Sequence, residues 1–317
     1  MLINRRYFLF IVILVIHILL VAACGGQTVT ETPTPGDGVP TAESAGRPLV
    51  LGDISDEPAE TIDGTQPIAD YLAANLSEHG ITQGEVKIAP DLETMIQWIQ
   101  DGEVDIYFDS PYPVLVISDE TGAVPVLRRF RFGVEEYHSV FFVQKGSEIA
   151  SLEDMMGQMV AFEEIFSTSG FMLPLSYLIS ENRSPVEKSS PDAEVAADEI
   201  GYVFSTADNT TVQWVISGVV PIGVVDNVTF GRLPQDTQDQ LEIIAETANV
   251  PRQLVLFRPG MDAALSIAIQ AVLLDMEENE EGQAALEAFQ TTEFDILPGG
   301  AEAALEQMRF FFELVQE

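Results

Sequence analysis

A turn rich in hydroxyl side chains follows a short apolar strand in the rear half of the chain. Residues 162–166 lead into Ser167-Thr168-Ser169-Gly170, and a run with helical periodicity comes next. Serine and threonine cap helices by accepting hydrogen bonds from the unpaired backbone N–H groups of the first turn. The same N–H groups can hold an anion, to which the hydroxyls add donors. The turn therefore predicts either an ordinary helix cap or a small-oxyanion site that uses Ser167, Thr168 and Ser169.

The residues of the common catalytic motifs are missing from the sequence. It has no Gly-x-Ser-x-Gly elbow, no His-Glu-x-x-His, no phosphate-binding loop and no Cys/His metal spacing. Of the three histidines, His17 lies in the apolar N-terminal run, and Cys24 is the single cysteine, which excludes an intramolecular disulfide. We therefore expect a binding protein that is not an enzyme and that uses no metal and no cofactor.

The elements that would position such a site alternate between strand and helix. Loops at 53–57 and 109–112 each follow a predicted strand. Such alternation is typical of a largely parallel sheet with helices on its faces, and ligands bind beyond the carboxyl ends of its strands. The front half is predicted to contain strands at 49–52, 86–89 and 104–108 and helices at 67–79 and 91–100.

The rear half repeats this alternation, which gives an α/β fold throughout. The polar, acidic stretch 180–200 predicts a surface loop. Strands are predicted at 139–143, 159–162, 202–204, 222–225, 242–245 and 253–257, and helices at 151–156, 169–179, 210–216, 262–276, 284–289 and 301–315.

The chain is strongly acidic. It has 51 Asp+Glu against 14 Lys+Arg, a formal net charge of −37, while 46% of its residues are apolar. The apolar content predicts a packed core rather than an acidic disordered chain. The charge excludes nucleic acid as a partner, because phosphate neutralisation needs clustered Lys and Arg. Because the acids are spread along the chain, they favour a solvated surface suited to high salt or low pH over a cationic partner.

The N-terminal segment predicts export and lipidation. Arg5 and Arg6 precede an apolar run at 7–23, and the sequence Val-Ala-Ala-Cys-Gly ends at residue 25. This ending resembles the bacterial lipobox, which implies a signal peptide at 1–23 that is cleaved before a lipid-bearing Cys24. The alternative is an uncleaved anchor helix; both place the body outside the cytoplasmic membrane. Residues 24–46, rich in Thr, Pro and Gly, predict a disordered tether.

Several short motifs resemble, in order and spacing, one family of transport proteins. Tyr137–Val143, Ile149–Gly157, Val160–Phe162 and the Ser-Thr-Ser-Gly turn resemble the phosphate/phosphonate-type substrate-binding proteins of bacterial ABC transporters. The resemblance covers about residues 48–290 and extends upstream through Gly52–Pro58, Pro67–Leu72 and Gly102–Ile106.

The resemblance implies a two-lobed type II periplasmic-binding-protein (venus flytrap) fold. Each lobe would be a mostly parallel sheet flanked by helices. Lobe one would comprise residues 47–134 plus 230–317, and lobe two residues 135–229. The family also implies a monomer that closes on a small-molecule ligand and delivers it to an ABC permease in the membrane.

The resemblance also implies a set of ligand-binding residues. In matching family members the Ser-Thr-Ser turn holds phosphoryl oxygens, so Ser167, Thr168 and Ser169 are expected to bind the ligand. The other candidates lie at predicted strand ends or at cleft positions: Asp53, Ser55, Tyr107, Ser110, Tyr112, His138, Asp208 and Asp226.

One departure from the family pattern leaves the ligand open. Many members have Gly-Ser-His-Asp where this chain has Ser205-Thr206-Ala207-Asp208, so the histidine is absent. Phosphonate, phosphite and phosphate are the expected oxyanions. The acidic residues also leave open a thiamine-precursor-like or other non-phosphorus ligand, and the same fold could act as a ligand sensor for a membrane kinase.

Overall fold

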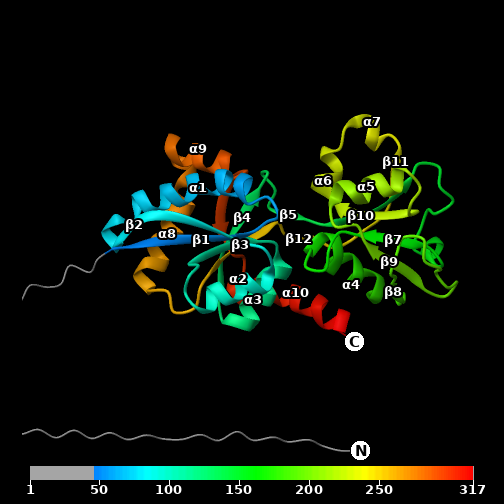
Figure 1. Ribbon diagram of the computed structural model, residues 1–317, viewed down its shortest axis with the longest axis horizontal. Helices are drawn as coiled ribbons and strands as arrows, with labels where there is room; N and C mark the ends of the chain where they lie inside the picture. The colour runs from blue at the N-terminus through cyan, green and yellow to red at the C-terminus, as the bar shows by residue number, and fades with distance from the viewer. Residues whose placement is uncertain (1–45, 317) are drawn as a thin grey trace, which may run out of the picture. The chain divides into compact units, whose positions relative to one another are not determined.

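Two six-stranded sheets form the framework of the computed structural model, which describes residues 46–316 (Figure 1). Both sheets belong to one compact unit of the chain. The first has the order β14-β4-β13-β3-β1-β2, with β1 (Arg47–Ile54), β2 (Ile81–Ala89), β3 (Ile106–Asp109), β4 (Val124–Arg131), β13 (Gln253–Phe257) and β14 (Thr291–Ile296). The second has the order β11-β6-β10-β7-β9-β8, with β6 (Ser139–Gln144), β7 (Met159–Phe162), β8 (Pro185–Glu187), β9 (Ile200–Phe204), β10 (Ile222–Asp226) and β11 (Leu241–Glu246).

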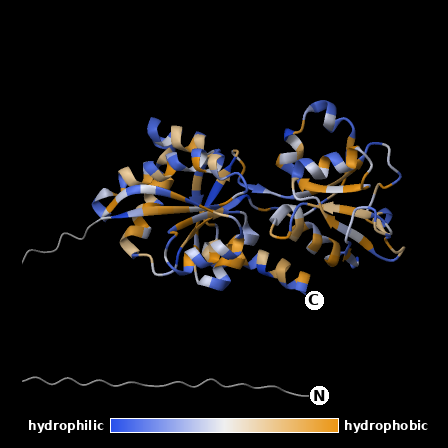
Figure 2. Ribbon diagram, viewed as in Figure 1, coloured by the Kyte–Doolittle hydropathy of each residue, from blue (hydrophilic) through white to orange (hydrophobic). Residues whose placement is uncertain are grey.

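Helices cover both faces of each sheet. On the first sheet, α1, α8 and α9 pack on one face and α2, α3 and α10 on the other; on the second, α4 and α5 pack on opposite faces. The central strands β6, β10 and β13 are nearly continuously apolar (Figure 2), as expected for strands buried on both faces. The helices are α1 (Pro58–Asn75), α2 (Leu92–Gln100), α3 (Pro111–Thr121), α4 (Leu173–Ser180), α5 (Asp208–Ile216), α6 (Asn227–Arg232), α7 (Gln235–Gln238), α8 (Ala263–Leu274), α9 (Glu280–Ala288) and α10 (Gly300–Gln316).

The chain crosses between the sheets at two adjacent places. β5 (Glu136–Tyr137) leads from β4 to β6, and β12 (Val250–Pro251) leads from β11 to β13. The two short strands pair antiparallel with each other (Figure 1). The predicted two-lobed α/β architecture is therefore confirmed, with β5 and β12 as the connection between the lobes.

Antiparallel strands lie next to the crossovers, so each sheet is mixed. β13 runs antiparallel to β3 and β4, and β6 runs antiparallel to β10 and β11, whereas β1 with β2 and β3, and β7 with β9 and β10, are parallel. The sequence places the end of lobe two at residue 229. Because β11 pairs with β6, we propose that this lobe extends to the end of β11 at Glu246.

The first helix begins earlier than its sequence predicts. Pro67 reads as a helix start, yet α1 begins at Pro58 and continues through Pro67 to Asn75. The turns before Pro67 are packed: Thr65 is 3% exposed, and a Cβ at Gly64 would lie 3.4 Å from the Ala288 carbonyl oxygen of α9. Two other local predictions also change, since 151–156 forms only a 3₁₀ turn (Glu153–Met155) and the stretch 180–200 contains β8.

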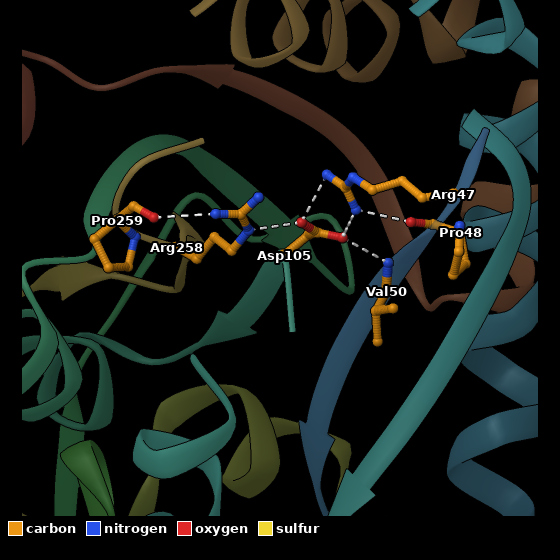
Figure 3. Close-up of polar contacts among 6 residues, drawn as sticks. All are labelled: Arg47, Pro48, Val50, Asp105, Arg258 and Pro259. Carbon is orange, nitrogen blue, oxygen red and sulfur yellow. Dashed lines mark hydrogen bonds and ion pairs between the residues drawn. The ribbon is translucent and has the colours of Figure 1, made fainter. Parts of the chain in front are cut away.

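A buried carboxylate fixes the amino end of β1 to the rest of the first sheet. Asp105, 1% exposed, accepts two hydrogen bonds from Arg47 (2.7 and 3.0 Å) and one from the Val50 backbone (3.0 Å). Arg258, just after β13, donates its Nε–H to the same carboxylate at 2.8 Å (Figure 3). Charge-assisted bonds of this kind are about twice as strong as neutral ones. Asp105 therefore ties the strands β1 and β3 to the segment after β13.

Candidate functional site

A cleft of about 700 Å³ lies where the carboxyl ends of strands from both sheets meet the crossovers. This is the edge at which the α/β alternation predicts a ligand. The lining comes from β1 and β3 in the first sheet, from β7 and β10 in the second, and from both crossovers. Its polar members include Asp53, Ser55, Asp109, Ser110, Arg129, Arg131, Tyr137, Glu163, Ser167, Ser169, Asp208, Asp226 and Arg252.

The hydroxyl turn caps the short helix η3 (Thr168–Met172), as one of its two sequence interpretations predicts. The Ser167 Oγ accepts a hydrogen bond from the Gly170 backbone N–H at 2.9 Å. Ser167 and Ser169 line the cleft. The cap uses the side chain of Ser167 alone, so capping does not exclude oxyanion binding at this turn.

Gly170 allows the turn to pack against Glu163. A Cβ at Gly170 would lie 2.4 Å from the Glu163 Cβ and 2.8 Å from the Ser167 Oγ. A side chain at this position would therefore displace its neighbours. The glycine therefore provides the room that Glu163 occupies beside the turn.

The threonine of the turn connects the two lobes. Thr168 is 1% exposed, and its Oγ1 accepts from the Tyr112 backbone N–H and donates to the Ser110 Oγ, both at 2.9 Å. Tyr112 itself packs beside Phe166 and Phe312. Thr168 and Tyr112 do not line the cleft. They hold the two lobes together beside it.

In the first lobe, the predicted residues divide into cleft and supporting positions. Asp53, Ser55 and Ser110 line the cleft. Tyr107 is fully buried and donates its hydroxyl to Asp109, which also accepts from the Ser110 backbone at 2.6 Å. Tyr107 therefore orients a cleft carboxyl from behind and does not itself face the cleft.

In the second lobe, two predicted acids line the cleft and the predicted histidine does not. Asp226 caps α6 by accepting from the Val228 and Thr229 backbone N–H groups at 2.9 and 3.0 Å. Asp208 lies nearby, and both acids belong to the lining. His138 places its Nδ1 2.8 Å from the Asn249 Oδ1, outside the lining. Ligand contact by any of these residues stays a prediction.

Burial raises the pKa of several cleft carboxyls. Burial, followed by the charge of Asp109, raises the pKa of Asp53 to about 6. Burial, together with the charges of Glu163 and Asp226, raises the pKa of Asp208 to about 8, and burial raises the pKa of Glu163 and Asp109 as well. Near neutral pH a protonated Asp208 can donate a hydrogen bond to an oxyanion, so the acidic cleft does not by itself exclude an anionic ligand.

Three arginines also line the cleft, although none of them belongs to a sequence motif that predicts ligand binding. Arg129 is fully engaged: its guanidinium donates to Thr291 at 2.7 Å, to Gln253 at 2.7 Å and to the Phe289 carbonyl. Arg131 and Arg252 each have a buried Nε without a hydrogen-bond partner among the described residues. For Arg129 and Arg131 the sequence contains an indication of a cleft position: three of only 14 basic residues fall within 128–131, beside the predicted lobe boundary.

Neither a membrane-spanning helix nor a metal cluster is found between residues 46 and 316. No helix in that range is long and apolar enough to cross a bilayer. No group of His, Cys, Asp and Glu in the same range is arranged to hold a metal ion. The predicted signal peptide, Cys24 and nearly all of the tether lie outside the described residues.

The two lobes, the paired crossovers and the polar cleft define a type II periplasmic binding protein. The family described as "ABC transporter, phosphonate, periplasmic substrate-binding protein" matches residues 53–297. The chain therefore belongs to the periplasmic substrate-binding proteins of phosphonate ABC transporters, a family that functions outside the cytoplasm.

Individual relatives are distant in sequence. The phosphate-import protein PhnD of Mycolicibacterium smegmatis is 27% identical over 184 residues, which are 56% of this chain and 53% of the relative. The chain thus matches about half the length of this curated relative.

Solved structures resemble the fold more completely. XAC2383 from Xanthomonas citri, bound to chloride ion, has a TM-score of 0.80 and 29% identity, and its ATP-bound structure has 0.79 and 28%; each comparison covers 84% of this chain and 98% of the other. PhnD1 from Prochlorococcus marinus in complex with methylphosphonate has a TM-score of 0.64 at 16% identity, over 84% of this chain and 98% of that one, which supports the fold alone.

Proposed function

We propose that this chain is the solute-binding lipoprotein of an ABC importer. It would capture a small oxyanion such as phosphonate, phosphite or phosphate in the cleft between its lobes and deliver it to a membrane permease. The observation that carries the proposal is the cleft itself: hydroxyls of Ser167 and Ser169 in one lobe and Ser110 in the other line one cavity with the guanidinium groups of Arg131 and Arg252. Both kinds of group donate hydrogen bonds to oxyanions.

A thermal-shift screen of the full chain tests this proposal. The probes are phosphate, phosphite, methylphosphonate, sulfate and a thiamine precursor, and ATP is included because a 28%-identical relative is described as bound to ATP. A ligand at a hundredfold excess over its Kd stabilises the native state by roughly 2.7 kcal/mol, which corresponds to about 5–10 °C in Tm for a body of this size. The absence of a shift with every phosphorus oxyanion would contradict the proposal.

The double variant Ser167→Ala/Ser169→Ala is expected to lose most of the phosphate- or phosphonate-induced shift. Loss of the Ser167 cap costs about 1 kcal/mol of helix stability, so the ligand-free protein should stay folded. The matched control is Ser151→Ala, whose hydroxyl bonds to Asp154 at 2.8 Å outside the cleft. Equal ligand shifts in the double variant and the control would refute the role of the hydroxyl turn.

Lipid anchoring is the second part of the proposal and depends on Cys24. The Val-Ala-Ala-Cys-Gly sequence and the preceding apolar run support it. Cys24→Ser is expected to abolish incorporation of labelled palmitate and to release the protein from the membrane fraction. Continued labelling of this variant would contradict the lipobox assignment.

The surplus of carboxyl groups in the cleft favours one alternative ligand class. The charge of Asp226 raises the pKa of Glu163 and of Asp208, and the charge of Glu163 also raises that of Asp208; a cationic group of a ligand would relieve this repulsion. A thiamine-precursor-like ligand has such a group. Stabilisation by this probe but by no oxyanion would favour the alternative. A sensor role for a membrane kinase would use the same ligand site. It would differ only in the partner protein that binds the closed, ligand-bound form.

A further inference from the structure

Two arginines stand at the two crossovers between the lobes. Arg131 is the last residue of β4, immediately before the first crossover. Arg252 lies between β12 and β13 in the second crossover, and its backbone N–H donates to the Glu135 carbonyl at 2.9 Å. Both line the cleft, where their guanidinium groups are contributed by segments far apart in the sequence. Any group bound to both would contact both crossovers at once.

The hydrogen-bonding capacity of these two side chains is largely unused. The Nε of each is buried and lacks a partner among the described residues. Arg131 has one long contact, from its Nη2 to the Gln290 Oε1 at 3.4 Å, and Arg252 lies over the Tyr137 ring at 4.4 Å. Neither guanidinium is part of an ion pair in residues 46–316. These Nε atoms are too buried for a cleft ligand to reach, so the donors available to one are the Nη groups of two cleft-lining arginines that form no ion pair within residues 46–316.

The neighbouring arginine shows what structural use of a cleft guanidinium requires. Arg129 lines the same cleft but donates to two side chains and one backbone carbonyl, as described above. Its guanidinium also stacks on Phe289, with its central carbon 3.4 Å from the ring centroid. Arg129 is therefore satisfied within the protein, whereas Arg131 and Arg252 are not.

The charges around the pair suit a compact oxyanion. Burial and the charge of Arg252 lower the pKa of Arg131, which places the two cations close enough to repel each other. The charges of Asp53, Asp109 and Asp226 raise the pKa of Arg131. The charge of Arg252 lowers the pKa of Glu163 and Asp208, and none of these acids forms an ion pair with either arginine. An oxyanion between the guanidiniums would accept from both planar forks and remove their mutual repulsion.

We propose that Arg131 and Arg252 are oxyanion-binding residues of the cleft and that one tetrahedral oxyanion bound between them links the two crossovers. The inference rests on the proposed function and extends it. It assigns the charged contacts to Arg131 and Arg252, on the side of the cleft next to the crossovers, while the hydroxyl turn provides neutral hydrogen bonds. A phosphate, phosphite or phosphonate group has the several oxygens that two forks can share.

Isothermal titration calorimetry on the full chain tests the assignment. The probes are inorganic phosphate, phosphite and methylphosphonate at one fixed ionic strength. Arg131→Gln and Arg252→Gln are each expected to weaken binding of the best probe about tenfold to a hundredfold, because each removes charged hydrogen bonds to the ligand. The matched control is Arg183→Gln. The Nε of Arg183 is also buried without a partner, but its guanidinium pairs with Glu153 at 2.8 Å and lies outside the cleft lining. The control should bind within about twofold of wild type, since no ligand contact is lost.

The lysine variants distinguish a contact from a mere charge. Arg131→Lys and Arg252→Lys keep the positive charge but lack the planar pair of Nη groups, so they should also lose affinity. If a glutamine variant fails to fold, the corresponding lysine variant decides the question. Wild-type affinity in the lysine variants, or in both glutamine variants, would overturn the inference and leave the proposed function standing. Failure of the wild-type protein to bind any of the three probes would overturn the proposed function and the inference together.

Discussion

Replacing Asp105 with alanine is expected to lower the free energy of unfolding by about 3 kcal/mol. The substitution leaves Arg47 and Arg258 without their shared acceptor and the Val50 N–H without a partner (Figure 3). Removing one partner of a buried ion pair costs about 3–5 kcal/mol. The lower end of this range applies because Arg47 is 41% exposed and can turn toward water. The measurement is the urea midpoint at constant m-value.

An exposed pair of similar geometry provides the control for this prediction. Asp119 accepts two hydrogen bonds from Arg309 at 2.6 and 2.7 Å, but the two side chains are 39% and 46% exposed. Exposed pairs contribute about 1 kcal/mol or less. Asp119→Ala should therefore change the urea midpoint much less than Asp105→Ala. Equal changes would show that burial of Asp105 does not determine the cost.

The second large effect is a dependence of stability on pH that originates in the cleft. In the unfolded chain an aspartate titrates near its ordinary value of about 4, whereas in the folded chain Asp208 titrates at about 8. Between these values the folded state binds the extra proton. The free energy of unfolding therefore falls as pH rises through this window, by at most about 1.4 kcal/mol per pH unit for one group.

Asparagine variants isolate the contributions of the two cleft acids. Relative to wild type, Asp208→Asn should gain stability steadily from about pH 4 to about pH 8, because asparagine has no proton to lose. Asp53→Asn should gain stability only up to about pH 6, where the folded-state pKa of Asp53 lies. The measurement is Tm at half-unit steps from pH 4.5 to pH 9.

A surface acid with the opposite shift serves as the control. Hydrogen bonds from Ser151 and the Ala150 backbone lower the pKa of Asp154, which is fully exposed. Asp154→Asn should therefore lose stability above about pH 4, the reverse of the cleft variants. If the curves of Tm against pH for Asp208→Asn and wild type are parallel over the whole range, the prediction that Asp208 has a raised pKa in the folded state is wrong.

Local sequence patterns predict the elements and the edge at which the cleft lies. Asp53, Ser110 and Asp226 follow predicted strands, and alternation alone is enough to bring strand ends to one edge of a sheet. The helix cap at Ser167 is equally local, since it depends on residues within three positions of one another.

Features that depend on contacts between distant segments could not be predicted in the same way. Thr168 reads as a ligand contact, yet its hydroxyl bonds to Tyr112, 56 residues earlier. The membership of β11 in the second sheet depends on pairing with β6. Arg131 and Arg252 come together only because the two crossovers pair through β5 and β12. The spacing of residues along the sequence does not indicate which distant segments pair. The basic cluster at 128–131, in contrast, can be recognised from the sequence alone.

The central claim is that an oxyanion binds between the hinge arginines and the hydroxyl turn. A crystal structure of the full chain grown with saturating methylphosphonate tests it most directly. We expect electron density for the phosphonate inside the cleft, within hydrogen-bonding distance of Arg131, Arg252 and Ser169. A structure in which that cleft holds only solvent, or in which the phosphonate binds elsewhere, would contradict the account.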